Sequence, residues 1–546
     1  MKYIFACAVA IGAMAQTPPS EPAAGSLSGV VREAGARVPL EGVRVWAGGS
    51  DATTGSQGQF TIPKLEPGRH WVSVYDQARA ASGGIYVLIN PGQNLTGVEV
   101  YVKTGGSISG RVVDEDRHSV SGAPVVLLEA VFEFGRPAYR PELTAQTDRR
   151  GNYRLAPVPA ERPFLILVKK PLQPIAADDS MPADPEKRPR LPMPAFYPGS
   201  PDLEGAQTVT LASSEDRRGV DIQMTSAPLY CIAGEILARD GTAVGSAVTE
   251  VTIAEQMPLV FRASFTPVSV KLTEGKFRAC GFHPGEYRIA AANSEGSRTE
   301  RWSASAPAIV TDRDRQDVQL SPAPAVTVSG DAVWDSEPIG KPAETRIRIG
   351  LSKSRDVTYA DEPKSPGHMM AGFSYGGRIR VPGDFTLENT PVDDYTLDLR
   401  EIPDGCYVKD ATLDGAAVLH QPLRLTQSAG GRLHIALACD AGSLTARVTD
   451  RDGNPISHVH LYVMPEEAPS AAALHEVLKQ ADVENGWSEA VKPLPPGKYL
   501  ALACDLEMDG TAEPVLKLWR ARSKATEVEI GAGATVQLTL QIADFP

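Results

Sequence analysis

The stretch Ser28-Gly29-Val30-Val31, followed by Gly58-Gln59-Phe60 and then by Pro67-Gly68-Arg69-His70, decides the fold of this chain. Residues 43–46, which lie between the first two segments, read Val-Arg-Val-Trp, the period-two alternation of a half-buried strand. Pro67-Gly68 places Pro and Gly at the two central positions of a type II turn. These signals predict short antiparallel strands joined by tight turns, as in a β-sandwich.

The same signals recur along the 546 residues. After Gly29, the strand glycine returns at Gly110, Gly234 and Gly330, and a weaker copy begins at Leu444. This long spacing is typical of whole domains rather than of solenoid repeats. We therefore predict an all-β protein, a tandem array of five antiparallel β-sandwich modules. The expected modules are residues 26–104, 105–228 (with a long Pro-rich loop at 171–194), 229–325, 326–440 (divergent) and 441–546.

One short helix is expected within this β-rich chain. Residues 470–480 carry Leu474, Val477 and Leu478 at helical spacing, and Ser470 precedes them as a possible N-cap. We place this helix in an excursion between two strands of the last module.

The repeated pattern resembles a known family of domains. In the first copy, the residues that form this pattern are Gly29, Pro39-Leu40, Gly42-Val43, Gly58 and Phe60, and later copies repeat them. With these residues the chain resembles the carboxypeptidase regulatory-like domains, which are transthyretin-like sandwiches similar to the B-type repeats of collagen adhesins. The segments Ala195-Phe196-Tyr197-Pro198-Gly199 and Tyr407-Val408-Lys409 look like signatures of large exported bacterial proteins of this type. The resemblance implies a fold, and that fold hosts many functions.

The N-terminal residues and the net charge predict the cellular location of the protein and the class of its partners. Lys2, the apolar residues 3–12 and Ala13-Met14-Ala15 match a signal peptide at residues 1–15, cleaved after Ala15. We expect a secreted, periplasmic or extracellular protein without a transmembrane anchor. The net charge of −13 argues against nucleic acid as a partner, because nucleic-acid binding needs a clustered basic face.

Five cysteines follow the expected cleavage site. An oxidising compartment permits disulfides, and an odd number of cysteines leaves one thiol over. Because Cys231 and Cys280 lie in one expected module, and Cys439 leads into the last module, which contains Cys504, we expect these two pairs to be bridged and Cys406 to be the leftover thiol. Separate buried thiols are the alternative.

The sequence shows no recognisable catalytic set, metal-ligand set or cofactor motif. The one His-x-x-Glu, His283-Pro284-Gly285-Glu286, coincides with a Pro-Gly turn, which cannot present both side chains as a helix would. His458 and His460 share one strand face, but two ligands do not make a zinc site. We therefore do not expect an enzyme.

These observations favour a non-enzymatic exported or cell-envelope protein whose modules act as structural spacers and adhesion-like interaction domains. The partner would be an unidentified envelope protein or polysaccharide; the alternative is polysaccharide binding through a starch-binding-like sandwich face. Phe196 and Tyr197 are possible contact aromatics, although packing inside the second module is the favoured interpretation. Other aromatics alternate with valines and are expected mostly to pack: Trp46, Trp71, Tyr75, Tyr86 and Tyr101.

Overall fold

The computed structural model describes residues 23–543, except 134, 170–180, 183, 238–249, 257–267, 294–301, 325, 336–344, 354–374, 427–430 and 457–458. Strands account for 61% and helices for 6%, so the protein is all-β, as predicted. The chain forms two compact units. The first comprises residues 1–107, 156–162 and 211–216, and the second comprises the rest.

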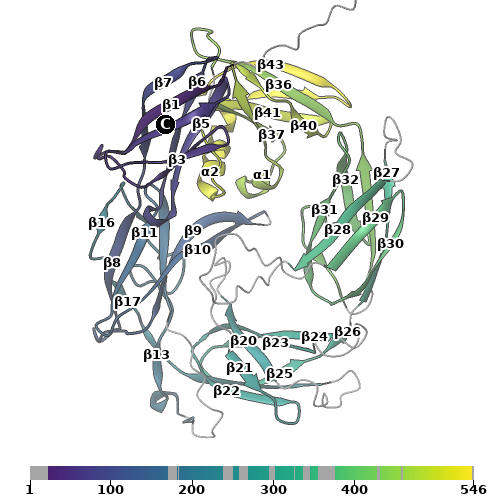
Figure 1. Ribbon diagram of the computed structural model, residues 1–546. Coiled ribbons are helices and arrows are strands. Elements are labelled where there is room, and N and C mark those ends of the chain that lie inside the picture. The colour runs from purple at the N-terminus through teal and green to yellow at the C-terminus, as the bar shows by residue number, and fades with distance from the viewer. Residues whose placement is uncertain are drawn as a thin grey trace, which may run out of the picture. The chain divides into compact units, whose positions relative to one another are not determined.

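The first unit contains two sheets packed face to face (Figure 1). Alternate residues of each strand point inward, and the core includes Leu27, Val45, Phe60 and Val74. One sheet has the order β4(Gln59–Leu65), β1(Gly25–Glu33), β7(Asn94–Val102), and the other has β3(Ser50–Thr53), β2(Arg44–Ala47), β5(Gly68–Asp76), β6(Ala81–Ile89).

A second pair of sheets follows along the chain. One sheet has the order β10(Arg136–Gln146), β9(Pro124–Glu133), β12(Pro163–Val168), β14(Ala195–Phe196), with β15(Val209–Thr210) also on β12. The other has β11(Asn152–Val158), β8(Gly106–Val113), β16(Asp216–Arg217), with β17(Ile222–Gln223) also on β8. The strands β13(Arg190–Pro192) and β18(Ser226–Pro228) pair separately.

Two further sheet pairs belong to the second unit. The third sheet pair consists of β22(Lys276–Phe282), β19(Tyr230–Ile236), β25(Arg315–Leu320) and of β21(Val268–Lys271), β20(Glu250–Gln256), β23(Gly285–Asn293), β24(Trp302–Val310), β26(Ala323–Pro324). The fourth consists of β30(Gly383–Thr390), β27(Val326–Trp334), β35(Arg432–Ala438), β32(Tyr407–Leu413), β33(Ala416–Ala417) and of β29(Tyr375–Val381), β28(Thr345–Lys353), β31(Asp394–Arg400), β34(Leu423–Arg424).

The C-terminal part differs, because its strands form one eight-stranded sheet rather than two sheets. The order is β40(Val491–Leu494), β36(Gly442–Thr449), β39(Trp487–Ser488), β38(Lys479–Glu484), β37(Val459–Pro465), β41(Gly497–Cys504), β42(Thr526–Ile530), with β43(Thr535–Gln541) also on β36. Helices α1(Ala471–Val477) and α2(Ala512–Ala521) lie beside this sheet (Figure 1). Helix α1 confirms the predicted helix, and Ser470 Oγ accepts a hydrogen bond from the N–H of Ala473 at 3.2 Å.

The repeated glycine signals correspond to one repeated contact. The N–H two residues after the strand glycine donates to the carbonyl of the turn glycine, as from Val31 to Gly58 at 2.8 Å and from Ile236 to Gly275 at 2.8 Å. Val448 makes the same bond to Gly486 at 2.7 Å. The repeats read from the sequence are therefore structurally equivalent at this point.

The strand glycine is required because its neighbours leave no room for a Cβ. A Cβ on Gly234 would lie 2.1 Å from the carbonyl oxygen of Val318 and 2.8 Å from the Phe277 ring. The same conflict arises at Gly29 and Gly330, each against the aromatic ring of its own G-x-F segment. The glycine therefore lets the first strand lie close to both the ring and the last strand.

The residue that follows the Pro-Gly turn by two positions is also equivalent between copies; it is a tyrosine in the third and last copies, and Tyr395 takes its place in the fourth, where the turn reads Asp393-Asp394. Tyr287 donates from its hydroxyl to the carbonyl of His283 at 2.8 Å, and Tyr395 and Tyr499 each reach the carbonyl four residues back at 2.7 Å. In the first copy His70 occupies this place, with Nε2 2.7 Å from the Glu66 carbonyl. The polar tip of each of these side chains is thus satisfied by the turn that precedes it.

No helix among the described residues has both the length and the apolar composition needed to cross a membrane. The predicted signal peptide at residues 1–15 lies outside the described residues.

Candidate functional site

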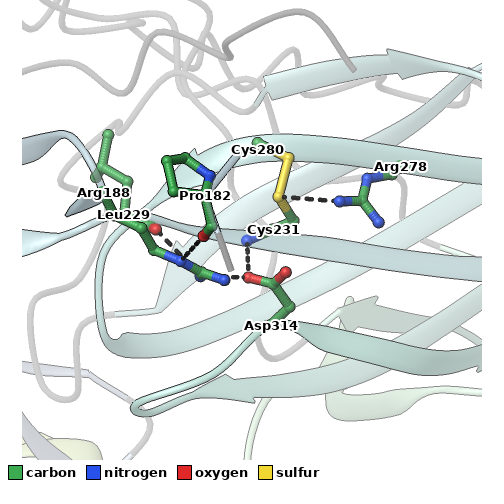
Figure 2. Close-up of a disulfide and its surroundings, with 7 residues drawn as sticks. All are labelled: Pro182, Arg188, Leu229, Cys231, Arg278, Cys280 and Asp314. Atoms are coloured by element: carbon green, nitrogen blue, oxygen red, sulfur yellow. Dashed lines mark hydrogen bonds and ion pairs between the residues drawn. A yellow bond between two sulfur atoms is a disulfide. The ribbon is translucent and has the colours of Figure 1, made fainter. Parts of the chain in front are cut away.

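The two disulfides of the described chain lie at the ends of paired strands. Cys231 of β19 faces Cys280 of β22 in the antiparallel register, and their sulfurs are joined (Figure 2). This is the pairing expected for these two residues. Arg278 Nη2 lies 3.6 Å from Cys231 Sγ.

The second disulfide corrects the sequence analysis. It joins Cys406 to Cys439, whereas a Cys439–Cys504 bridge was expected. The reason is strand register: Tyr407 of β32 is opposite Ala438 of β35, so the cysteines next to them meet across the same ladder. Cys439 therefore forms a disulfide within the fourth sheet pair and not within the C-terminal part. Cys504 is a free thiol, fully buried, and burial raises its pKa to about 12.

A buried arginine connects the segment before the third sheet pair to that pair. Arg188 Nη1 binds Asp314 Oδ1 at 2.6 Å, and Arg188 Nε donates to the Pro182 carbonyl at 2.7 Å (Figure 2). The N–H of Cys231 also donates to Asp314 Oδ1, at 3.0 Å. The guanidinium lies over the Tyr230 ring at 4.9 Å. These contacts satisfy a buried charge and give the arginine a structural role.

A second buried charge pair includes the histidine of the His-x-x-Glu segment. Lys169 forms an ion pair with Glu255 Oε2, and both side chains are nearly inaccessible to solvent. His283 Nδ1 lies 3.9 Å from Glu255 Oε1 and 3.3 Å from the Tyr287 hydroxyl. Burial lowers the pKa of His283 below its ordinary value, so the imidazole is neutral at pH 7. His283 is thus part of a packed interior.

The described residues contain no group of three or more His, Cys, Asp or Glu side chains placed to hold a metal ion. His458 lies outside the described residues, and His460 Nδ1 lies 2.9 Å from Asp482 Oδ1.

Phe196, named as a possible contact aromatic with packing as the favoured interpretation, is buried. Its side chain is 2% exposed and packs with Val126, Leu128, Leu165 and Leu167 in the core of the second sheet pair. The physical reason is that β14 pairs with β12, with Leu167 opposite Phe196, which turns the ring inward. Tyr197 is half-buried beside it. The favoured packing interpretation therefore describes Phe196.

Three exposed aromatic residues of the first unit lie on one face instead. On the outer face of the sheet β3-β2-β5-β6, which we call the aromatic face, Trp46 is 42%, Trp71 is 38% and Tyr75 is 65% exposed. Trp71 is opposite Tyr86, and their ring centroids are 4.5 Å apart at an interplanar angle of 53°. Leu88, on the same edge strand as Tyr86, is 56% exposed. Four rings and one leucine thus form a largely apolar surface.

Polar groups border the aromatic face. The Arg44 guanidinium lies over the Trp46 ring at 4.7 Å and donates from Nε to Asp51 Oδ2 at 2.8 Å. That hydrogen bond holds the pKa of Asp51 below its ordinary value. A Cβ on Gly84 would lie 2.4 Å from the Trp71 ring, so the ring lies directly over this glycine. The Trp71 ring therefore covers Gly84 at one border of the face, and charged groups lie at the other.

The expectation that these aromatics pack in the core was wrong for Trp46, Trp71 and Tyr75. They alternate with valines, but side chains at alternate positions of a strand point to opposite faces. Val72 and Val74 fill the core and therefore place Trp71 and Tyr75 outside. Because valines occupy the buried positions, the alternation indicates that the aromatic residues between them are exposed.

Comparisons with known proteins give no family. No family model matches this chain, and no curated protein matches it. A streptococcal ancillary pilin is 12% identical with a TM-score of 0.21, covering 55% of this chain and 99% of that one. The shaft pilin SpaA from Lactobacillus rhamnosus GG is 10% identical with a TM-score of 0.20, covering 38% of this chain and 98% of that one.

A DUF3823 family protein from Parabacteroides merdae is 17% identical with a TM-score of 0.14, covering 30% of this chain and 80% of that one. TM-scores this low carry no argument about the present chain. Its resemblance to carboxypeptidase regulatory-like domains stays a prediction.

Proposed function

We propose that this chain is a non-enzymatic exported protein whose sandwiches act as spacers and adhesion-like interaction modules, with the aromatic face as its contact surface. The observation that carries the proposal is the exposure of Trp46, Trp71 and Tyr75 together on one sheet. Two disulfides support an oxidising compartment outside the cytoplasm.

The chemistry of this face suits an interface. Tryptophan, tyrosine and arginine are the residues enriched at the energetic centres of protein interfaces, and large exposed apolar patches commonly mark binding sites. Trp46 with Arg44 above it, and Trp71 beside Tyr86, supply such residues on a rigid sheet rather than on a loop. Little conformational entropy is lost when a partner covers side chains that already contact one another.

Polysaccharide binding through the same face is the second candidate. Trp71, Tyr86 and Tyr75 present flat apolar rings over which sugar rings can stack, and tyrosine hydroxyls offer hydrogen bonds at the rim. The Arg44–Asp51 pair adds donors and acceptors next to Trp46. In this case the contact would be to an envelope polysaccharide rather than to an envelope protein.

The test uses the full mature chain, immobilised and exposed to cell-envelope fractions. Trp71→Ala combined with Tyr75→Ala should abolish retention of the bound component. Tyr101→Ala is the matched control, because Tyr101 is 41% exposed in β7, which belongs to the other sheet of the first unit. Loss of the bound component after protease indicates a protein partner, and loss after periodate indicates a polysaccharide. Equal retention by wild type and the double variant would exclude the aromatic face.

A further inference from the structure

A row of arginines covers the outer face of one sheet in the fourth sheet pair. Strand β28 reads Thr-Arg-Ile-Arg-Ile and strand β29 ends Arg-Ile-Arg-Val, so the isoleucines point to the core and the arginines point to solvent. Strand β31 adds one more arginine at its end. We call the resulting surface the arginine face; it consists of Arg346, Arg348, Arg378, Arg380 and Arg400, all exposed.

The strand register places these like charges directly opposite one another. Arg346 is opposite Arg380, and Arg348 is opposite both Arg378 on one side and Arg400 on the other. Like charges at such positions destabilise a sheet. The chain as a whole carries a net charge of −13, so this concentration of positive charge is a local feature. An anionic ligand would remove the repulsion.

Two carboxylates neutralise part of the arginine face. Asp398 Oδ2 accepts from Arg400 Nη2 at 2.7 Å, and Glu401 Oε2 accepts from Arg378 Nε at 3.1 Å. A neighbouring pair, Arg424 with Asp394 at 2.9 Å, is already neutral.

At the centre of the arginine face, no carboxylate of the described chain neutralises the positive charges. Arg346 and Arg348 make no hydrogen bond or ion pair with any residue in the described part of the chain. All the cationic side chains of the arginine face are arginines, whose planar guanidinium can hold a carboxylate or sulfate through two parallel hydrogen bonds.

The geometry points to an extended polyanion, and we propose that the arginine face binds an acidic polysaccharide. Neighbouring strands lie about 4.8 Å apart and alternate residues of one strand about 6.7 Å apart, so the guanidinium groups form a regular grid. A polymer with one carboxylate or sulfate per sugar can meet several points of that grid along its length. No aromatic residue lies among the described residues of this outer face, so stacking of nucleic-acid bases has no support there.

The disulfide between Cys406 and Cys439 joins two strands of the same sheet pair and supports an exported location, which agrees with an envelope polysaccharide as the ligand. The arginine face lies in the second unit and is made of other residues than the aromatic face of the first unit. The two proposals can therefore fail separately, and Trp71→Ala should leave polyanion binding unchanged.

The experiment titrates the full mature chain with polygalacturonate by calorimetry at about 50 mM and about 200 mM salt. We expect binding at the lower salt concentration and a clear weakening at the higher one. Arg346→Gln combined with Arg348→Gln should raise the Kd by at least about tenfold, because two charge-assisted contacts are lost. The matched control is Arg149→Gln combined with Arg150→Gln, which removes the same charge from an exposed turn of the second sheet pair and should leave the Kd unchanged.

Thermal unfolding at low salt gives a second readout. Because the Arg346/Arg348 variant loses a repulsion, its Tm should equal or exceed that of wild type, which also shows that it is folded. Absence of polygalacturonate binding by wild type, or an equal loss in both double variants, would overturn the site. Tighter binding of polyglutamate or duplex DNA at matched charge would overturn the polysaccharide assignment.

Discussion

Replacing the strand glycine of the third sheet pair by alanine tests whether the repeated motif is imposed by packing. In Gly234→Ala the new Cβ would lie 2.1 Å from the Val318 carbonyl oxygen and 2.8 Å from Phe277 Cζ. The oxygen belongs to the backbone of β25, and the Phe277 side chain is buried. Neither neighbour can move without displacing the core or the last strand.

The expected magnitude follows from two opposing effects. Alanine in place of glycine inside a strand normally stabilises by about 0.5–1 kcal/mol through chain entropy. Overpacking a core costs about 1–3 kcal/mol, and more where backbone must shift. Because the closest contact here is to backbone, we expect a net loss of about 2 kcal/mol in the free energy of unfolding of the third sheet pair. Hydrogen exchange of β19 and β22 peptides across a urea series measures this quantity locally in the full chain.

The C-terminal sheet supplies the control. There the corresponding residue is Ala446, and its N–H donates to Ser488 Oγ at 2.8 Å, so a serine replaces the phenylalanine ring. Ala446→Gly should cost about 1–2 kcal/mol, because the entropy effect of about 0.5–1 kcal/mol adds to the loss of a buried methyl group, about 0.8 kcal/mol. If β19 and β22 keep wild-type protection from hydrogen exchange in Gly234→Ala, packing is not the reason for the glycine at this position.

Three further outcomes are expected. Phe196→Ala should lower the free energy of unfolding of the second sheet pair by about 3–5 kcal/mol, measured by local hydrogen exchange, whereas unchanged stability would return Phe196 to the contact residues. Non-reducing peptide mapping should find Cys406 joined to Cys439, and a Cys439–Cys504 peptide would contradict the register argument. Reduction of this disulfide should lower the free energy of unfolding of the fourth sheet pair by about 4 kcal/mol. The buried Cys504 thiol should be alkylated only in urea. The third sheet pair should lose stability as pH falls below about 6.5, because the unfolded chain protonates His283 before the folded one does, and urea midpoints of a His283→Asn variant should lack that loss.

The fold was predictable because its signals are local. A glycine, an aromatic residue and a Pro-Gly turn lie within about forty to fifty residues, and each makes one repeated contact, such as the hydrogen bond from the Val31 N–H to the Gly58 carbonyl. The helix after Ser470 was predictable for the same reason, since its cap lies three residues away. Helix α2 was missed, although it buries Val515 and Leu518 against the C-terminal part. The cysteine pairing depended on which strands become neighbours, and the sequence positions of Cys406 and Cys439 alone do not show that β32 and β35 pair.

The two candidate surfaces illustrate why composition was misleading. A net charge of −13 averages over the chain, yet Arg346 and Arg348 are separated by one buried isoleucine, and the same is true of Arg378 and Arg380. In a strand, that spacing is sufficient to place all four side chains on one face once the two strands pair. Period-two alternation therefore carries information about both faces of a sheet: the buried residues identify the core, and the residues between them describe the surface presented to a partner. Applied to the aromatic face, the same rule makes Trp71 and Tyr75 exposed because Val72 and Val74 are buried.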